Sequence, residues 1–184
     1  MEKIYTSLGL MSGTSLDGVD VSIIKSDGHN EYSSIIDRYF KYDDELVQKI
    51  LKTREKIFNI EDLLSNSEEI KAIEREITLF HADVVNKTLK ISESTVDLIG
   101  FHGQTIFHNP AKRLTKQLGD GNLLSQLTKK KVIYDFRKND VESGGQGAPL
   151  APIFHNVIAN SINKRFKLQF PINILNIGGI ANIT

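Results

Sequence analysis

The stretch GLMSGTSLDGVD, residues 9–20, leaves an apolar strand, passes through small, polar and acidic residues, and returns to apolar alternation. A two-residue turn such as Asn-Gly is enough to reverse an antiparallel pair of strands. Here the turn contains Gly13, Thr14, Ser15, Asp17 and Gly18. This surplus of glycine, hydroxyl and carboxyl groups indicates a turn that does more than reverse the chain.

The opening turn has the chemistry of an anion-binding site. Successive backbone N–H groups in such a turn can converge into a nest for phosphate oxygens, and the hydroxyl groups of Thr14 and Ser15 add donors. Asp17 and Asp20 would hold Mg²⁺ through its water shell beside the phosphates. The stretch is not a Walker A loop, because no GK[ST] is present. The alternative is an ordinary hairpin with Asp17 and Gly18 as its turn residues.

The composition excludes several classes of protein. The 184 residues contain 23 Lys and Arg against 23 Asp and Glu, so no basic field is present to bind nucleic acid. The chain has no cysteine, which excludes disulfides and thiolate metal sites. The N-terminus does not resemble a signal peptide, and no run of 18 apolar residues occurs. We expect a soluble cytoplasmic protein with one main domain and no membrane partner.

The period of the hydrophobic pattern changes along the chain. Alternating β-branched residues predict strands at 4–11, 19–24 and 32–42. Helical spacing predicts a helix that begins behind Asp43 and a long helix from Ser67 to Lys90. The remaining predicted elements are a strand at 96–101, a helix at 122–130, a strand at 131–136, a helix with Pro149 near its first turn, and two final strands. This order predicts an α/β fold with a mixed sheet.

Polar residues follow the predicted strand that ends at Phe101, where open α/β sheets bind ligands. The segment GFHGQT, residues 100–105, offers His102, Gln104 and Thr105 for hydrogen bonds to a polyol or sugar. A histidine with a purely structural role is the alternative. The other histidines have no zinc-ligand spacing with His102, so we expect no zinc site.

Three further segments carry polar groups at predicted strand or helix ends. QLGDGN, residues 117–122, contributes Asp120. DFRKND, residues 135–140, contributes Arg137, which either clamps a carboxylate or pairs with Asp135 or Asp140 to hold a loop. ESGGQGAPLAP, residues 142–152, either presents a helix N-terminus to an anion or is a flexible connector.

The last segment, NIGGIANIT at 176–184, repeats the pattern of the opening stretch with a turn at Gly178 and Gly179. Two such turns predict two related lobes that hold one phosphate chain between them. The chain ends a few residues into its last strand, which would leave an exposed edge. We therefore expect a fragment or a split form of a longer protein.

Together these segments resemble the anhydro-N-acetylmuramic acid kinases of the ASKHA superfamily, which also contains actin-like ATPases. The motifs GLMSGTSLDGVDV, GFHGQTIFHNP, QLGDG, DFRKNDVESGGQGAPLAP and NIGGIANIT occur in the family's order and spacing. The resemblance implies a ribonuclease H-like βββαβαβα lobe with a mixed sheet over residues 1–170, followed by the first strands of a truncated second lobe at 171–184. It also implies an ATP- and Mg²⁺-dependent enzyme of peptidoglycan recycling, which opens 1,6-anhydro-N-acetylmuramate by hydrolysis and converts it to N-acetylmuramate 6-phosphate.

The resemblance also implies roles for individual residues. The implied nucleotide-binding residues are Gly13, Thr14, Ser15, Leu16, Asp17, Gly18, Val19, Asp20, Gly178 and Gly179, with Asp17 and Asp20 holding the metal through water. The implied sugar-binding residues are His102, Gln104, Thr105, Asp120 and Arg137. Family members carry a GFDTGPGN-like segment in a second lobe, and its aspartate is the expected general base. We expect that base to lie beyond Thr184, so this chain alone should have little kinase activity.

The expected partners are ATP and the anhydro-sugar, together with either a second copy of the chain or a complementing C-terminal half. A rival hypothesis is a catalytically inactive remnant that binds sugar or phosphate. A third is a different sugar kinase or phosphatase of the same superfamily.

Overall fold

A mixed five-stranded sheet forms the centre of the computed structural model, which describes residues 3–177 and 181–184. Its strands run in the order β3-β2-β1-β4-β7. Their bounds are β1 Tyr5–Met11, β2 Gly18–Ser26, β3 Tyr32–Lys41, β4 Leu98–Phe101 and β7 Lys131–Ile133. The first three strands pair antiparallel, whereas β1, β4 and β7 pair parallel. The predicted α/β fold with a mixed sheet is therefore confirmed.

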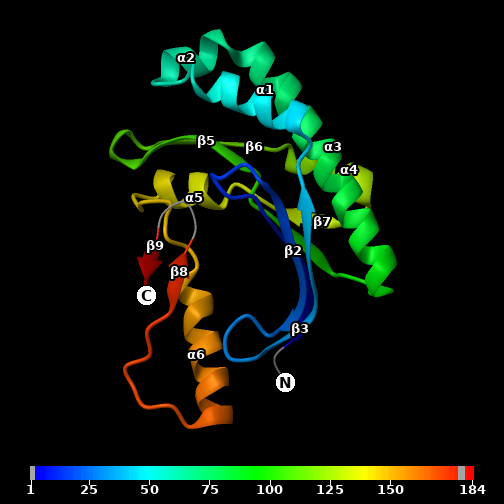
Figure 1. The fold of residues 1–184 in the computed structure, drawn as a ribbon, viewed down its shortest axis with the longest axis vertical. Helices are drawn as coiled ribbons and strands as arrows, with labels where there is room; N and C mark the ends of the chain where they lie inside the picture. Colours follow the sequence, from blue (N-terminus) through cyan, green and yellow to red (C-terminus); the bar gives the residue numbers. More distant parts are fainter. Residues whose placement is uncertain (1–2, 178–180) are drawn as a thin grey trace.

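The two faces of the sheet differ in character, because side chains alternate along a strand. Leu8 and Leu10 of β1 lie on the buried face with Val19, Val21 and Ile23 of β2. Two helices pack behind that face, α1 (Asp44–Arg54) and α3 (Ser67–Ser92), and α6 (Pro152–Phe166) lies across the opposite face (Figure 1). The core therefore lies between the sheet, including β4, and the helices α1 and α3.

The two predicted helices begin where the sequence indicates. The Asp43 side chain accepts from the Leu46 amide at 2.7 Å and caps α1. Ile70, Ile73 and Ile77 of α3 form the start of a buried stripe. A short helix, α2 (Ile60–Ser65), was not predicted and is held by a capping box between Asn59 and Asp62.

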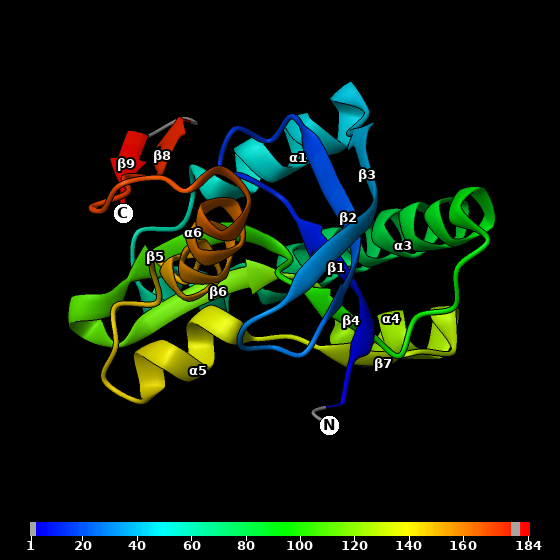
Figure 2. The same cartoon turned by 90° about the horizontal axis from the view of Figure 1, so that it is seen from below.

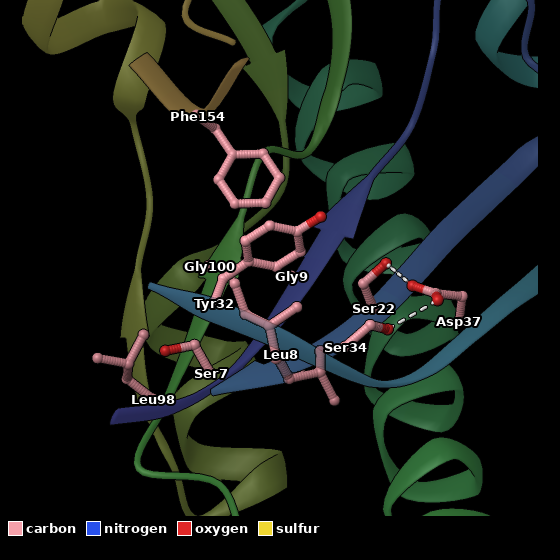
Figure 3. A pocket seen from close by; sticks show the side chains of 11 residues that line it. Ser7, Leu8, Gly9, Ser22, Tyr32, Ser34, Asp37, Leu98, Gly100 and Phe154 are labelled. Atoms are coloured by element: carbon pink, nitrogen blue, oxygen red, sulfur yellow. Dashed lines mark hydrogen bonds between the residues drawn. The ribbon is translucent and has the colours of Figure 1, made fainter. Parts of the chain in front are cut away.

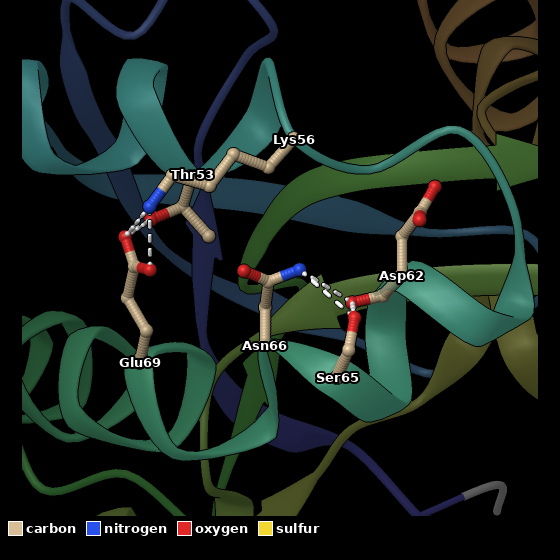
Figure 4. A network of polar contacts seen from close by, with 6 residues as sticks. All are labelled: Thr53, Lys56, Asp62, Ser65, Asn66 and Glu69. Carbon is tan, nitrogen blue, oxygen red and sulfur yellow. Dashed lines mark hydrogen bonds and ion pairs between the residues drawn. The ribbon is translucent and has the colours of Figure 1, made fainter.

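Polar contacts fix the corner where α1, α2 and α3 meet (Figure 4). The Thr53 hydroxyl donates to Glu69 at 2.8 Å, and the Lys56 ammonium contacts the same carboxylate at 2.7 Å. The Asn66 amide donates to the Asp62 carbonyl at 2.8 Å. These contacts fix the start of α3 against the end of α1.

The second half of the described chain departs from the prediction in three places. Residues after Phe101 form a strand, β5 (Gln104–Asn109), which pairs with β6 (Leu114–Leu118) across the 3-10 turn η1 (Pro110–Lys112), where a polar turn was expected. A helix, α5 (Phe136–Glu142), follows β7 and was not predicted. The last helix begins at Pro152 rather than near Pro149. The predicted helix near 122–130 is α4 (Gly121–Thr128).

The final residues form a separate antiparallel pair, β8 (Leu175–Ile177) and β9 (Ala181–Ile183). The strands of the predicted hairpin are thus confirmed, while its turn residues Gly178 and Gly179 lie outside the described residues. Figure 2 shows the pair beside α6 and away from the central sheet. The proposed domain limits of 1–170 and 171–184 remain a prediction.

The second face of the sheet carries small, polar and apolar side chains beneath α6. A cavity of about 430 Å³ opens there between the strands and Phe154 of α6, whose ring meets that of Tyr32 at a centroid distance of 5.1 Å (Figure 3). The hydroxyl groups of Ser22 and Ser34 donate to Asp37 at 2.6 and 2.8 Å. These two hydrogen bonds lower the pKa of the Asp37 carboxyl.

Strand β3 lies at one edge of the sheet, where it pairs with β2. The pairing shifts register between Ile23 and Ile24, which marks a bulge.

Among the described residues, no helix combines the length and the apolar character needed to cross a membrane.

Candidate functional site

The turn between β1 and β2, residues 12–17, is anchored from within by Leu16. This residue has a positive φ of 60°, and its side chain is only 3% exposed, so it packs in the core. The Leu16 amide donates to the Gly13 carbonyl at 3.3 Å and closes the turn. Val19 is buried as well. The side chains of these two predicted nucleotide-binding residues are therefore closed to a ligand.

Donors from the body of the protein hold the carbonyl groups of the turn. The Gly13 carbonyl accepts from Gln104 Nε2 at 2.9 Å, and the Thr14 carbonyl accepts from Arg54 Nη1 at 3.3 Å. In a trans peptide the C=O and N–H bonds point in opposite directions. The Thr14 and Ser15 N–H groups, which belong to these two peptides, consequently point away from the protein body.

The far end of the turn is held in the same way. The Asp17 carbonyl accepts from the Tyr39 hydroxyl at 2.7 Å and from the Tyr42 amide at 3.1 Å. Within residues 3–177 and 181–184, the backbone N–H groups of Gly13, Thr14 and Ser15 have no acceptor. The turn therefore offers outward-facing donors of the kind that bind an anion.

Two carboxylates lie beside these donors. Asp17 and Asp20 are exposed, and the Ser15 hydroxyl donates to Asp17 Oδ1 at 2.7 Å. Partial burial and the negative charge of Asp17 raise the pKa of Asp20. A divalent cation bound through water would relieve this repulsion, so the donor set fits Mg²⁺. The described residues contain no group of three or more His, Asp or Glu side chains that could hold a metal ion directly.

Gly18 has a packing role at the start of β2. A Cβ at this position would overlap the Phe40 carbonyl oxygen and would lie 2.9 Å from Tyr39 Cε2. A Cβ at Gly13 would meet the Ser15 hydroxyl oxygen at 3.1 Å, the end of an exposed side chain. The two glycines of the turn therefore serve different needs.

His102 and Arg137 form a second polar site at the end of β4. His102 Nδ1 lies 2.5 Å from the Gly103 carbonyl, which can only accept, so Nδ1 carries the proton. Nε2 then accepts from Arg137 Nε at 2.7 Å. Burial, and secondly the positive charge of Arg137, lower the pKa of His102 to about 4. The imidazole is therefore neutral near pH 7.

Arg137 also connects this site to the glycine-rich segment. Its Nη1 donates to the Gly147 carbonyl at 2.7 Å, and the Gly147 amide donates to Asp140 Oδ2 at 2.7 Å. Arg137 thus contacts His102 and Gly147 in place of the predicted partners Asp135 and Asp140. Gly147 has a φ of 68°, and a Cβ there would lie 2.7 Å from a Val141 methyl group. These contacts give the segment a defined path into α6.

A family model described as anhydro-N-acetylmuramic acid kinase matches residues 5–184. The chain belongs to this family. It is 58% identical over 184 residues to the anhydro-N-acetylmuramic acid kinase of Pelagibacter ubique. This alignment covers 100% of the chain and 48% of the Pelagibacter protein. It is 40% identical over 190 residues to the Agrobacterium fabrum kinase, with 100% and 50% covered. The match to the Paramagnetospirillum magneticum kinase is 42% over 181 residues, with 97% and 46% covered.

The chain therefore spans about half the length of these kinases. The resemblance to the N-terminal portion of the family and its ASKHA-type fold is confirmed. The family is one of sugar kinases, which agrees with the enzyme class that the motifs imply for the family. The individual site residues remain predictions.

The structure brings the two predicted kinase sites together through Gln104. Its side chain is fully buried and donates to Gly13, while its Oε1 has no partner among the described residues. The other two predicted sugar-side residues lie on neighbouring elements. Thr105 accepts from Gln117 Nε2 at 3.3 Å, and Asp120 caps α4 by accepting from the Leu123 amide at 2.9 Å.

A polar cavity of about 290 Å³ lies next to Asp120. It is lined by Glu74, Thr115, Lys116, Gln117, Gly119, Asp120, Gly121, Asn122, Tyr134, Asp135 and Lys138. Glu74 Oε1 accepts from Lys116 Nζ at 2.6 Å and from the Gly119 amide at 3.2 Å. Sequence reasoning missed Glu74 and Lys116, because in the sequence Glu74 is one of many charged residues of a long amphipathic helix. The distance in sequence between Glu74 and the QLGDG segment did not indicate that the two lie together.

Proposed function

We propose that this chain is the N-terminal lobe of an anhydro-N-acetylmuramic acid kinase and that its 12–17 turn binds the phosphates of ATP. The observation that supports this role is the direction of the turn's peptides. Gln104 and Arg54 hold the carbonyls of Gly13 and Thr14, so the N–H groups of Thr14 and Ser15 face outward.

The proposed reaction couples hydrolysis to phosphoryl transfer. Water adds to the anomeric carbon of 1,6-anhydro-N-acetylmuramate, the bond from that carbon to the 6-oxygen breaks, and the 6-oxygen accepts the γ-phosphoryl group. The products are N-acetylmuramate 6-phosphate and ADP. Bound Mg²⁺ would neutralise phosphate charge, with Asp17 and Asp20 as its water-mediated holders. We assign this activity to the cytoplasm and to peptidoglycan recycling.

On the sugar side, we assign substrate contacts to His102, Gln104, Thr105, Asp120 and Arg137. Because His102 Nε2 accepts from Arg137 at 2.7 Å and its pKa lies near 4, His102 orients the guanidinium and does not act as the base. The general base is assigned to the half of the enzyme that the relatives have in addition to this region, since they are about twice as long. A complementing C-terminal half is therefore the proposed partner.

Reconstitution tests the proposed function. The purified chain is mixed with the C-terminal half of the Pelagibacter ubique kinase, and ADP release is measured with 1,6-anhydro-N-acetylmuramate. We expect sugar-dependent turnover from the mixture, little from the chain alone, and a loss with Gly13→Val. Gly9→Ala is the matched control, since a Cβ there would meet nothing closer than the Ser22 carbonyl oxygen at 4.0 Å.

Two results would contradict the proposal. Robust turnover by the chain alone would show that no second half is needed. Failure of the chain to bind Mg-ATP, alone and in the mixture, would remove the nucleotide-binding role. Binding without turnover in the mixture would instead favour the inactive binding module.

A further inference from the structure

Three buried side chains from separate parts of the chain meet beneath the 12–17 turn. Ser12 and Tyr42 are each 1% exposed, and His81 is fully buried. The Ser12 hydroxyl lies 2.9 Å from the Tyr42 hydroxyl and 3.1 Å from His81 Nε2. We propose that Tyr42 and His81 are positioning residues that act through Ser12 to hold the turn in its phosphate-binding shape. This inference rests on the proposed function.

The hydrogen bonds in this cluster have one consistent direction. His81 Nδ1 lies 2.7 Å from the Ile77 carbonyl of its own helix, which can only accept, so Nδ1 carries the proton. Nε2 must then accept from the Ser12 hydroxyl. The Ser12 oxygen in turn accepts from the Tyr42 hydroxyl, so each proton has a defined place.

Burial keeps the cluster uncharged. It lowers the pKa of His81 to about 4 and raises the pKa of Tyr42 above its ordinary value. The His81 ring also packs against that of Phe101, at a centroid distance of 4.9 Å. The cluster is thus fixed to α3 on one side and to β4 on the other.

Tyr42 holds both ends of the turn at once. Its backbone amide donates to the Asp17 carbonyl at 3.1 Å, and its side-chain hydroxyl contacts Ser12 at 2.9 Å. Ser12 precedes Gly13, where the outward-facing peptides begin. Apolar side chains would be enough to fill the core at this place, because a buried polar group is costly unless it is hydrogen-bonded. The arrangement therefore determines where the turn leaves β1, and with it the direction of the Thr14 and Ser15 N–H groups.

The test separates positioning from stability. Tyr42→Phe removes one hydroxyl and keeps the ring. Thr88→Val is the matched control, because Thr88 is equally buried on α3 and its hydroxyl donates to the Val84 carbonyl of the same helix at 2.8 Å. Urea unfolding gives the stability of each variant. Titration calorimetry gives the Kd of Mg-ATP for the chain alone and mixed with the C-terminal half.

We expect both variants to lose a similar amount of stability, while Tyr42→Phe alone weakens Mg-ATP binding by about tenfold, the effect of about one hydrogen bond. Ser12→Ala removes the contact with His81 as well as the contact with Tyr42, so it should weaken binding at least as much as Tyr42→Phe. Tyr42→Phe combined with Ser12→Ala should be no worse than Ser12→Ala alone, since Tyr42 acts through Ser12. Unchanged binding in folded Tyr42→Phe, or an equal loss in Thr88→Val, would overturn the positioning role alone. Absence of binding by the unmodified chain in both settings would overturn the proposed function and the positioning role with it.

Discussion

The two glycines of the opening turn should respond to the same substitution in opposite ways. In Gly18→Ala the new methyl group would overlap the Phe40 carbonyl oxygen and lie 3.0 Å from Lys41 Cα, both backbone atoms of β3. Backbone cannot rotate away, so β2 and β3 must separate locally. Overpacking of this kind costs about 1–3 kcal/mol. For a chain of this size the melting temperature should fall by about 2–12 °C.

In Gly13→Ala the new methyl group would meet Ser15 Oγ at 3.1 Å and the Ser15 amide nitrogen at 3.9 Å. The exposed Ser15 side chain can rotate, so stability should change by no more than about 0.5 kcal/mol. The methyl group would, however, stand beside the outward-facing N–H groups and obstruct a phosphate. We expect Mg-ATP binding to weaken by about tenfold or more.

Urea unfolding followed by circular dichroism measures the first effect, and titration calorimetry measures the second. Gly9→Ala is the control for both, because its methyl group would make only an ordinary van der Waals contact, with the Ser22 carbonyl oxygen at 4.0 Å. The reasoning would fail if Gly18→Ala were as stable as the unmodified chain. It would also fail if Gly13→Ala bound Mg-ATP as tightly as the unmodified chain.

Three further predictions follow from the site. His81 and His102 have a pKa of about 4 in the folded chain and about 6.5 in the unfolded chain. The folded state is therefore fully stable above pH 6.5 and loses up to about 1.4 kcal/mol per pH unit for each histidine as the pH falls toward 4. Urea midpoints measured from pH 7 to 5 should show this slope, and His102→Gln should reduce the slope by about half. Asp120→Ala and Asp43→Ala each remove a helix N-cap, so each should lower the free energy of unfolding in urea by about 1 kcal/mol. Only Asp120→Ala should weaken sugar binding measured by calorimetry. Equal sugar binding by the two variants would contradict the assignment of Asp120. Gln104→Leu removes a buried oxygen that has no partner within the described part of the chain, together with the hydrogen bond to Gly13. Stability should therefore change by less than about 1 kcal/mol while Mg-ATP binding weakens, and a large loss of stability with normal binding would contradict this.

The sequence predicted the first half of the fold well because local signals agreed with tertiary packing there. β1 and β2 alternate between core and opposite face, and Asp43 is a strong N-cap directly before an apolar stripe. The long helix α3 keeps one apolar stripe along most of its length. Periodicity alone is enough for such elements.

The elements that were missed lack a local signal. In α5 only Val141 is buried, and the residue before the helix, Asp135, has a positive φ and gives no side-chain cap. The β5–β6 hairpin carries polar residues and turns through Pro110, and proline is uncommon within strands. Their positions are set by contacts with other elements, which the sequence does not reveal.

The site shows the same division. Residue types identified the turn and its donors, because glycine, hydroxyl and carboxyl groups gather in a short stretch. The partners of those residues were not predictable, since they lie far away in the sequence. Arg137 is 35 positions from His102, and Ser12 is 69 positions from His81. The role of Gly18 in packing likewise depends on β3, which returns to it only after a long hairpin.

The register shift between β2 and β3 has a consequence for molecules at high concentration. β3 lies at the edge of the sheet, where unpaired backbone groups can recruit a strand from a neighbouring molecule. The bulge, which leaves Ile35 of β3 without a register partner opposite Ile23 and Ile24, adds local twist, and the strand carries Asp37, Arg38 and Lys41. An incoming strand would have to match the twist and desolvate these charges, so the edge is protected against edge-to-edge aggregation.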